Sequence, residues 1–286
     1  MTIRGVLRPA AAVAVVLGLA ACAQRGGTAT PATTTATVAP AAAVGLVLRV
    51  EYTGGFISPS VLVSRLPIMS VYADGRVLSD GPVEAIYPGP ALPNIQETTI
   101  DQGTVQDLVN QAMAAGVAET SDLGSPPVAD APSTRFTVVT ADETYQREVY
   151  ALFESPLEGG GLTPDQEAAR AKLSDLLATL TGVAAGASEA YEPDAVAAIS
   201  SPWIDPGDGL APPETAWPGP ALPGEPTGPL PDVGCVTATG DQARALLGAA
   251  ASANAATPWV GADGTRWSVI FRPLLPDESG CADLTD

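Results

Sequence analysis

The feature that most constrains the fold is a change of hydrophobic period between residues 46 and 190. Residues 46–52 begin as an apolar run and become alternating, which is typical of a strand with one strongly buried face. Residues 104–115 instead carry apolar side chains at helical spacing, and Gly116 follows where a helix C-cap would lie. These patterns predict an α+β fold in which antiparallel β hairpins are covered by amphipathic helices, in one domain or two fused halves.

Two hairpins are expected in the first half of the chain. Residues 68–73 and 76–79 flank Asp74-Gly75, a dipeptide typical of two-residue turns in which both central residues need positive φ. Residues 134–140 and 145–152 are β-rich runs on either side of a polar tetrapeptide. Residues 95–100 form one further expected strand.

A second helix is expected from Pro164 to about Leu180. Thr163 and Gln166 match a capping box, and proline suits the first helical turn. Four leucines, at positions 173, 176, 177 and 180, give the helix a stripe that we interpret as core packing. Residues 181–190, which are mostly small, are expected to be flexible.

The second half combines recognisable elements with a long irregular stretch. The expected elements are strands at 196–199, 233–239 and 265–272, a helix at 241–253 and a turn at 262–264. Proline and glycine recur through residues 201–231 too often for either regular element. Trp203 and Trp217 within that loop are expected to pack on the domain, and a ligand-stacking face is the alternative. Asp and Gly recur at residues 205–209, but without the ligand spacing of a calcium loop, so a turn is expected there.

A heptapeptide occurs twice with one difference. Tyr-Pro-Gly-Pro-Ala-Leu-Pro at residues 87–93 returns at 217–223 with tryptophan in place of tyrosine. Each copy precedes a strand-like run and then a helix. The match is compatible with an internal duplication and also with coincidence in a chain rich in Pro, Gly and Ala, because one short match does not establish a repeat.

The titratable residues restrict the chemistry. The chain contains no histidine and a single lysine, Lys172. The absence of histidine removes Ser-His-Asp and Cys-His catalysis and histidine-ligated zinc. Lys172 lacks the Ser-x-x-Lys context of serine–lysine enzymes. The sequence therefore indicates no catalytic, cofactor-binding or metal-ligating residue, and carboxylate pairs are the main catalytic option that remains.

The N-terminus has the marks of an export signal. Arg4 and Arg8 precede an apolar segment that ends in Leu-Ala-Ala-Cys at residues 19–22. This run resembles the lipobox of bacterial lipoproteins, and the resemblance implies that Cys22 receives a diacylglyceryl group and becomes the first residue after cleavage. Ordinary cleavage without lipid and a retained helix are the alternatives, although residues 5–21 are at the short limit for spanning a bilayer. The protein is thus expected on the outer face of the cell membrane.

Charge and composition add to this expectation. Loss of residues 1–21 leaves 11 basic and 32 acidic residues, a net charge of −21. Nucleic acid is therefore excluded as a partner, because phosphate binding needs a basic patch. The abundance of Ala, Gly and Pro, with arginine in place of lysine, indicates a GC-rich genome such as that of an actinobacterium.

The two remaining cysteines, Cys235 and Cys281, are expected to form a disulfide. An even pair of cysteines in an exported protein is more often bonded than free. Such a bond would hold the loop that carries Asp277 and Glu278 against the sheet. The segment from Cys235 to Cys281, with its Arg-Pro-Leu-Leu-Pro-Asp-Glu run, also resembles the C-terminal part of uncharacterised actinobacterial secreted proteins, and this resemblance implies no activity.

The sequence predicts four regions. They are a signal peptide (1–21), a flexible Ala/Thr/Pro tether (22–45), an α+β half (46–190) and a Pro-rich loop with a second α+β half (191–286). The function expected from this organisation is that of a lipid-anchored envelope protein of unknown biochemical activity, which binds an unknown envelope protein or ligand or has an accessory role. A carboxylate-based hydrolase and a small-ligand or calcium-binding module are the alternatives.

Overall fold

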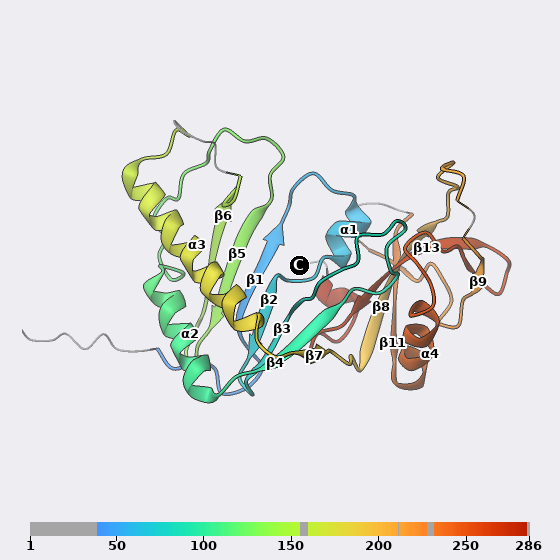
Figure 1. The fold of residues 1–286 in the computed structure, drawn as a ribbon, viewed down its shortest axis with the longest axis horizontal. Coiled ribbons are helices and arrows are strands. Elements are labelled where there is room, and N and C mark those ends of the chain that lie inside the picture. The colour runs from blue at the N-terminus through green and yellow to red at the C-terminus, as the bar shows by residue number, and fades with distance from the viewer. Residues whose placement is uncertain (1–38, 155–159, 211, 228–231, 285–286) are drawn as a thin grey trace, which may run out of the picture. The chain divides into compact units, whose positions relative to one another are not determined.

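Two β-sheets form the framework of the protein (Figure 1). The structure, a computed structural model, describes residues 39–154, 160–210, 212–227 and 232–284. One sheet is built from strands between residues 46 and 190, and the other from strands between residues 195 and 273. Helices cover the sheets, and nearly all strand pairs are antiparallel, so the expected α+β fold class is confirmed. The signal peptide and most of the expected tether lie outside the described residues.

The first sheet has the strand order β6-β5-β1-β2-β3-β4-β7. Its strands are β1 (Leu46–Thr53), β2 (Met69–Tyr72), β3 (Arg76–Asp80), β4 (Ile95–Thr99), β5 (Ser133–Val139), β6 (Thr144–Tyr150) and β7 (Glu189–Ala190). β1 lies at the centre, where Val50 pairs with Met69 on one side and with Phe136 on the other. The strands and both hairpins expected in this half are confirmed.

The turn between β2 and β3 differs from the expected type. Gly75 has a φ of 93°, but Asp74 does not have a positive φ, so the expected two-residue turn is wrong. The chain instead reverses over three residues, the N–H of Gly75 donates to the carbonyl of Tyr72 at 3.0 Å, and Asp74 accepts from the N–H of Arg76 at 3.1 Å. A Cβ at Gly75 would lie 2.2 Å from the carbonyl oxygen of Ile100, so the position requires glycine for space as well as for φ.

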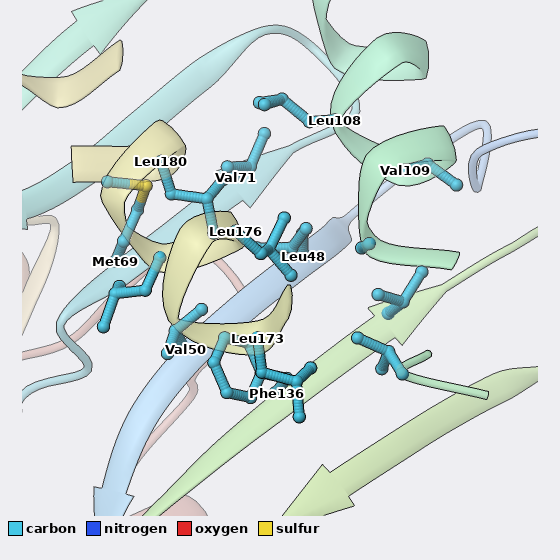
Figure 2. Packing of buried hydrophobic residues seen from close by; sticks show 14 of the residues in the cluster. Leu48, Val50, Met69, Val71, Leu108, Val109, Phe136, Leu173, Leu176 and Leu180 are labelled. Carbon is cyan, nitrogen blue, oxygen red and sulfur yellow. The ribbon is translucent and has the colours of Figure 1, made fainter. Parts of the chain in front are cut away.

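Two long helices cover one face of the first sheet (Figure 2). α2 (Gln102–Ala114) is capped by Asp101, and α3 (Pro164–Ala184) carries the predicted capping box of Thr163 and Gln166. Their leucine and valine side chains pack on the buried side chains of β1, β2 and β5, which confirms that the leucine stripe belongs to the core. α3 continues to Ala184 and β7 then pairs with β4, so the flexible segment expected at 181–190 is wrong for those residues.

The second sheet has the strand order β10-β11-β8-β13-β12-β9. Its strands are β8 (Ala195–Pro202), β9 (Thr215–Ala216), β10 (Glu225–Pro226), β11 (Gly234–Thr239), β12 (Trp259–Val260) and β13 (Arg266–Pro273). β8 is a central strand between β11 and β13, and it is longer than the four residues expected. β9 and β10 are short strands inside the stretch 201–231, which was expected to contain no regular element.

Helices from different parts of the chain cover the two faces of the second sheet. α4 (Gly240–Ala250) packs on one face together with Trp217, Trp259 and Phe271. The ring centroids of Trp259 lie 5.7 Å from Trp217 and 5.2 Å from Phe271, both in edge-on geometry. The short helix α1 (Pro59–Ser64), which the sequence pattern did not predict, packs on the other face through Val63. Because α1 lies between β1 and β2 in the chain, it joins the first half to the second sheet.

The two tryptophans of the long loop have different surroundings. Trp217 packs in the second core and its indole N–H donates to the carbonyl of Pro220 at 2.5 Å, which confirms the packing interpretation. Trp203 is half-buried, and the guanidinium of Arg266 lies 5.7 Å from its ring centroid. Of the matching residues in the two heptapeptides, Tyr87 is exposed whereas Trp217 is in the core. The first residues of the two heptapeptides therefore have different environments, whereas the matching leucines, Leu92 and Leu222, both pack against the second core.

Residues 40–42 belong to the folded domain. Ala41 forms an isolated bridge with Thr140, and its N–H donates to the side chain of Gln106 at 2.9 Å. Ala41 and Ala42 also pack against the first core. The folded domain therefore begins within the expected tether, because the backbone of residues 40–42 hydrogen-bonds with Val139, Ala141 and Gln106.

Candidate functional site

A pocket of about 390 Å³ gathers much of the positive charge of this acidic protein. It is formed by the end of β1, the helix α1 with the residues after it, β5 and the C-terminal segment. Four arginines line it, namely Arg49, Arg65, Arg135 and Arg272. We call it the arginine pocket. With a net charge of −21 expected after cleavage, four guanidinium groups around one hollow are a marked local concentration of positive charge.

The local sequence explains how α1 forms one wall of this pocket. The hydroxyl of Ser58 accepts from the N–H of Val61 at 3.4 Å, and Pro59 occupies the first helical turn, where its missing N–H costs no hydrogen bond. The helix ends before Leu66-Pro67, because a residue that precedes proline disfavours the helical conformation. Arg65 is its C-cap residue and has an extended backbone.

Three of the four arginines are already paired with carboxylates. Nη2 of Arg49 lies 2.9 Å from Asp277, and Nη2 of Arg272 lies 2.7 Å from Glu278. Arg135 lies 3.3 Å from Glu148 and 3.7 Å from Glu51, at partly exposed positions. The side chain of Arg272 is only 2% exposed, so removal of Glu278 would leave a buried charge without a counter-ion.

Arg65 differs from the other three arginines. Its Nη1 donates to the backbone carbonyl of Gly54 at 3.1 Å, and no carboxylate within the described part of the chain pairs with it. Partial burial lowers the pKa of its guanidinium below the ordinary value, although arginine stays charged at physiological pH. Arg65 therefore brings a positive charge to the pocket that is not yet neutralised by an ion pair.

The residues after β13 bridge the two sheets, and we call residues 274–278 the C-terminal strap. Leu274 packs with residues of the second sheet, whereas the next residue, Leu275, packs with Tyr72 of the first. Asp277 then accepts hydrogen bonds from the hydroxyl of Tyr72 at 2.7 Å and from Arg49 at 2.9 Å. Burial, together with this carboxylate, raises the pKa of Tyr72 above the ordinary range of a phenol.

Two further contacts hold the strap. The hydroxyl of Tyr191 donates to the carbonyl of Leu274 at 2.9 Å, and burial raises the pKa of Tyr191 to about 12. Glu278 accepts from the N–H of Leu275 at 2.7 Å in addition to its pairing with Arg272. Asp277 and Glu278 are thus the side chains that anchor the strap. The sequence analysis expected only that the loop carrying them would be held against the sheet.

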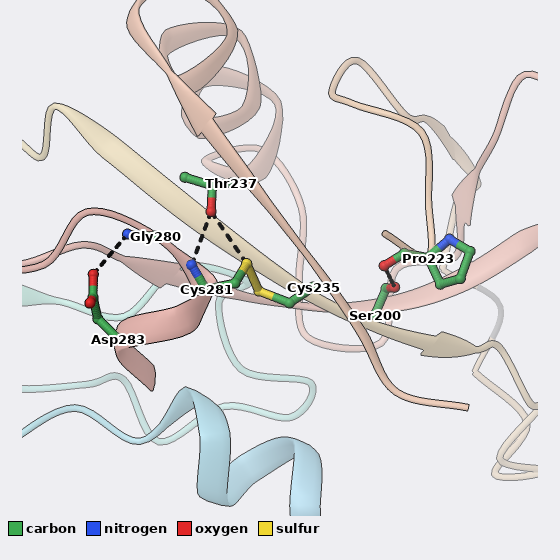
Figure 3. The surroundings of a disulfide bond; sticks show 7 residues. All are labelled: Ser200, Pro223, Cys235, Thr237, Gly280, Cys281 and Asp283. Atoms are coloured by element: carbon green, nitrogen blue, oxygen red, sulfur yellow. Dashed lines mark hydrogen bonds between the residues drawn. A yellow bond between two sulfur atoms is a disulfide. The ribbon is translucent and has the colours of Figure 1, made fainter. Parts of the chain in front are cut away.

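The predicted disulfide between Cys235 and Cys281 is present (Figure 3). Its Cα atoms are 6.0 Å apart, within the range of ordinary disulfides. The hydroxyl oxygen of Thr237 accepts from the N–H of Cys281 at 3.1 Å, which fixes the start of the final 3₁₀ turn (Cys281–Leu284). In that turn Asp283 accepts from the N–H groups of Ser279 and Gly280, and these bonds lower the pKa of its carboxyl. The disulfide therefore secures the wall of the arginine pocket that the final turn forms.

Exposed apolar side chains lie beside the pocket, on the segment that leads into α1 and on α1 itself. Phe56 is 87% exposed, and Ile57, Val61 and Leu62 are each exposed over more than a third of their surface. We call these four residues the apolar patch. Leu62 also lines the arginine pocket, so the patch and the pocket adjoin. Solvent exposure of several large apolar side chains in one short segment is typical of a binding surface.

A larger groove of about 910 Å³ adjoins the pocket on another side. It lies between β2, β3 and the start of β4 on one side and the C-terminal end of α3 on the other. Tyr52, Arg65 and Leu66 line both hollows. Asp80 also lines the groove, and burial raises the pKa of its carboxyl even though solvent still reaches the side chain.

The carboxylates around the arginine pocket serve the fold. Glu278 neutralises Arg272 and binds a backbone N–H, Asp283 caps the final turn, and Glu51 lies near Arg135. Within the described residues no group of three or more potential metal-ligating side chains comes together.

The sequence analysis located some of these residues and missed others. Cys235 and Cys281 are brought together as expected, whereas Cys22 lies outside the described residues. Arg49, Arg65 and Arg272 were not identified as site residues. A signal existed for two of them, since Arg49 and Arg272 interrupt apolar strands, where an arginine is rarely buried without a partner.

The sequence matches no protein-family model and no curated protein. Within the part of the chain that the structure describes, no helix has both the length and the apolar character needed to cross a bilayer.

Proposed function

We propose that this protein is a lipid-anchored component of the cell envelope that binds a protein partner through its apolar patch and performs no catalysis. The observation that supports the binding role is the exposure of Phe56, Ile57, Val61 and Leu62 beside the arginine pocket. Burial of such side chains against a partner would supply the main driving force for association.

The charge of the molecule indicates the kind of partner. The surface is strongly acidic in general, but the patch borders the pocket that holds four arginines. A partner with apolar side chains and a flanking acidic residue would match both features, because rim charges of opposite sign increase association rates and fix orientation. The partner is therefore expected to be another envelope protein with an acidic rim around an apolar surface.

The anchor rests on the lipobox sequence at residues 19–22. Replacement of Cys22 by serine removes the thiol that would carry the diacylglyceryl group. The variant is expected to leave the membrane fraction, as measured by carbonate washing and fractionation of cells. A Cys22→Ser protein that stays in the membrane would contradict the proposed lipid anchor. It would not bear on the proposed binding role of the apolar patch.

The patch is tested by crosslinking in the native envelope. A photo-crosslinking residue at position 56 is expected to capture one protein, and the same residue at position 204 is not. Ile204 is a matched control because it is 80% exposed, close to the 87% of Phe56.

The captured protein is then purified, and its affinity for the wild-type chain is measured. Val61→Asp is expected to weaken that affinity by about tenfold or more, because a charge would be desolvated in an apolar interface. Equal affinities of the wild type, Val61→Asp and Ile204→Asp would contradict the proposed surface.

A further inference from the structure

The arginine pocket and the larger groove share three lining residues, and one of them, Arg65, suits an anionic ligand. Tyr52, Arg65 and Leu66 line both hollows, so Arg65 lies where the two adjoin. The groove, at about 910 Å³, is at the upper end of the size range of ligand-binding cavities, and the pocket, at about 390 Å³, is near the lower end. A ligand held at Arg65 therefore has space on either side of the guanidinium.

The charge balance around Arg65 leaves one positive charge for a ligand. Arg49, Arg135 and Arg272 all pair with carboxylates of the chain itself. Arg65 donates to a backbone carbonyl from Nη1, and the planar guanidinium has five N–H donors in total. Its remaining donors match the two oxygens of a carboxylate or a phosphate, which accept from arginine in a bidentate manner. A bound anion would also offset the cost of partial burial that lowers the pKa of Arg65.

The walls of the groove are suited to an apolar body. Ile68, Met69, Val83, Pro93 and Ala184 are among its lining residues. The acidic residue of the groove, Asp80, disfavours a second anionic group there, so a negative head group is directed to Arg65. A ligand with one charged end and one apolar end fits this distribution, whereas a compact dianion does not.

We propose that Arg65 binds the head group of a small amphipathic anion whose apolar body lies in the groove. A fatty carboxylate and a single-chain lipid phosphate share this chemistry. The site adjoins the proposed protein-binding surface, because Leu62 of the apolar patch lines the pocket, but neither Phe56 nor Val61 lines the pocket or the groove. The two proposals are tested with different ligands and different variants, so their outcomes are distinguishable.

The test is isothermal titration of the mature chain, from residue 22 onward with Cys22→Ser, purified oxidised and without detergent. Decanoate and decyl phosphate are the amphipathic probes, and decanol, acetate and inorganic phosphate are the controls. At least one of the two amphipathic anions is expected to bind at least tenfold more tightly than any control. The preference between them distinguishes a fatty acid from a phosphate-bearing lipid. Binding of acetate or phosphate as tight as that of the amphiphiles, or no binding of either amphiphile, would overturn the proposal.

Variants locate the two ends of the ligand. Arg65→Gln is expected to weaken binding of the preferred amphiphile about ten- to a hundredfold and to change decanol binding by less than about twofold. Arg65→Lys is expected to lose less than Arg65→Gln because it keeps the charge, but still to bind more weakly than the wild type because lysine cannot form the bidentate contact. Val83→Asp alters an exposed side chain of the groove and is expected to weaken binding of the amphiphile.

Arg244→Gln is the matched control, since Arg244 is an exposed arginine on α4 that lines neither hollow. It is expected to leave the affinity unchanged. Thermal melting of each variant verifies that it is folded. An Arg65→Gln protein that melts like the wild type and binds the amphiphile with wild-type affinity would refute the role of Arg65.

Discussion

The two sheets of this protein are stabilised by different kinds of core. The first core is aliphatic, and two long helices place leucines and valines on one face of a seven-stranded sheet. The second core is built around Trp217, Trp259 and Phe271, with alanines on β8 and on α4. Small residues let the helix approach the sheet closely, and the aromatic rings fill the remaining volume.

The difference also concerns where the packing residues come from. The first core takes its side chains from regular strands and helices. The second takes Trp217 and Leu222 from the long Pro-rich loop and Leu92 from the loop before β4. A disulfide, a short helix from the first half and the C-terminal strap complete it. A sheet with few bulky residues of its own thus depends on segments that are distant in sequence.

The largest expected effect comes from removal of one ring from each core. Phe136 and Trp259 are each 1% exposed, and Phe136→Ala and Trp259→Ala are each expected to lower the free energy of unfolding by about 3–5 kcal/mol. Urea unfolding measures the total loss. Native-state hydrogen exchange is expected to rise mainly in β1 and β5 for Phe136→Ala, and mainly in β8 and β13 for Trp259→Ala.

Leu210→Ala serves as the control for both variants, since Leu210 is exposed and belongs to neither core. It is expected to change the free energy of unfolding by less than about 0.5 kcal/mol. If Trp259→Ala raises exchange equally in β1 and β8, the two cores unfold as one unit and the distinction between them does not apply to stability.

The contrast explains which parts of the fold were predictable from the sequence. The strands and helices of the first half have regular periods and recognisable caps, such as Thr163 with Gln166, so their positions follow from local chemistry. The disulfide followed from the cysteine count in a chain that was expected to be exported. Both kinds of signal are contained in short stretches of sequence or in composition.

The parts that were missed depend on contacts between distant residues. α1 has six residues, too short for a periodic signal, and its position depends on Val63 packing against the second sheet. β9 and β10 have two residues each and exist because neighbouring strands offer free edges. The arginine pocket joins β1, α1, β5 and the C-terminus, and no local pattern brings Arg49 near Asp277, which lies 228 residues away.

A smaller effect is expected from removal of the disulfide, which belongs to the second region alone. For a sequence separation of 46 residues, the chain-entropy treatment gives about 4 kcal/mol, and strain commonly reduces this value, so a loss of about 2–4 kcal/mol is expected for Cys235→Ser with Cys281→Ser. Hydrogen exchange is expected to rise in β11 and in the final turn. The count of free thiols in the denatured, non-reduced Cys22→Ser protein verifies the bond, and two titratable thiols would contradict it.

The smallest expected effect concerns the contact between the strap and the first sheet. In Tyr72→Phe the ring stays buried but no longer donates to Asp277, so the free energy of unfolding is expected to fall by about 1 kcal/mol at neutral pH. Tyr87→Phe is the matched control, because its hydroxyl also donates to an aspartate, Asp208, but the side chain is 75% exposed. That substitution is expected to leave the free energy of unfolding unchanged within the error of the measurement.

The pH dependence provides an independent check of the same contact. The pKa of Tyr72 is raised in the folded protein, so above the ordinary phenol value of 10.0 the unfolded chain releases a proton that the folded protein retains. The folded state then binds more protons than the unfolded state, and its stability falls as pH rises. Tyr72→Phe lacks this group and is expected to lose less stability than the wild type between pH 9 and pH 11, roughly the region around the ordinary phenol value. Parallel stability curves for the two proteins over that range would show that Tyr72 is not held protonated by Asp277 and its buried position.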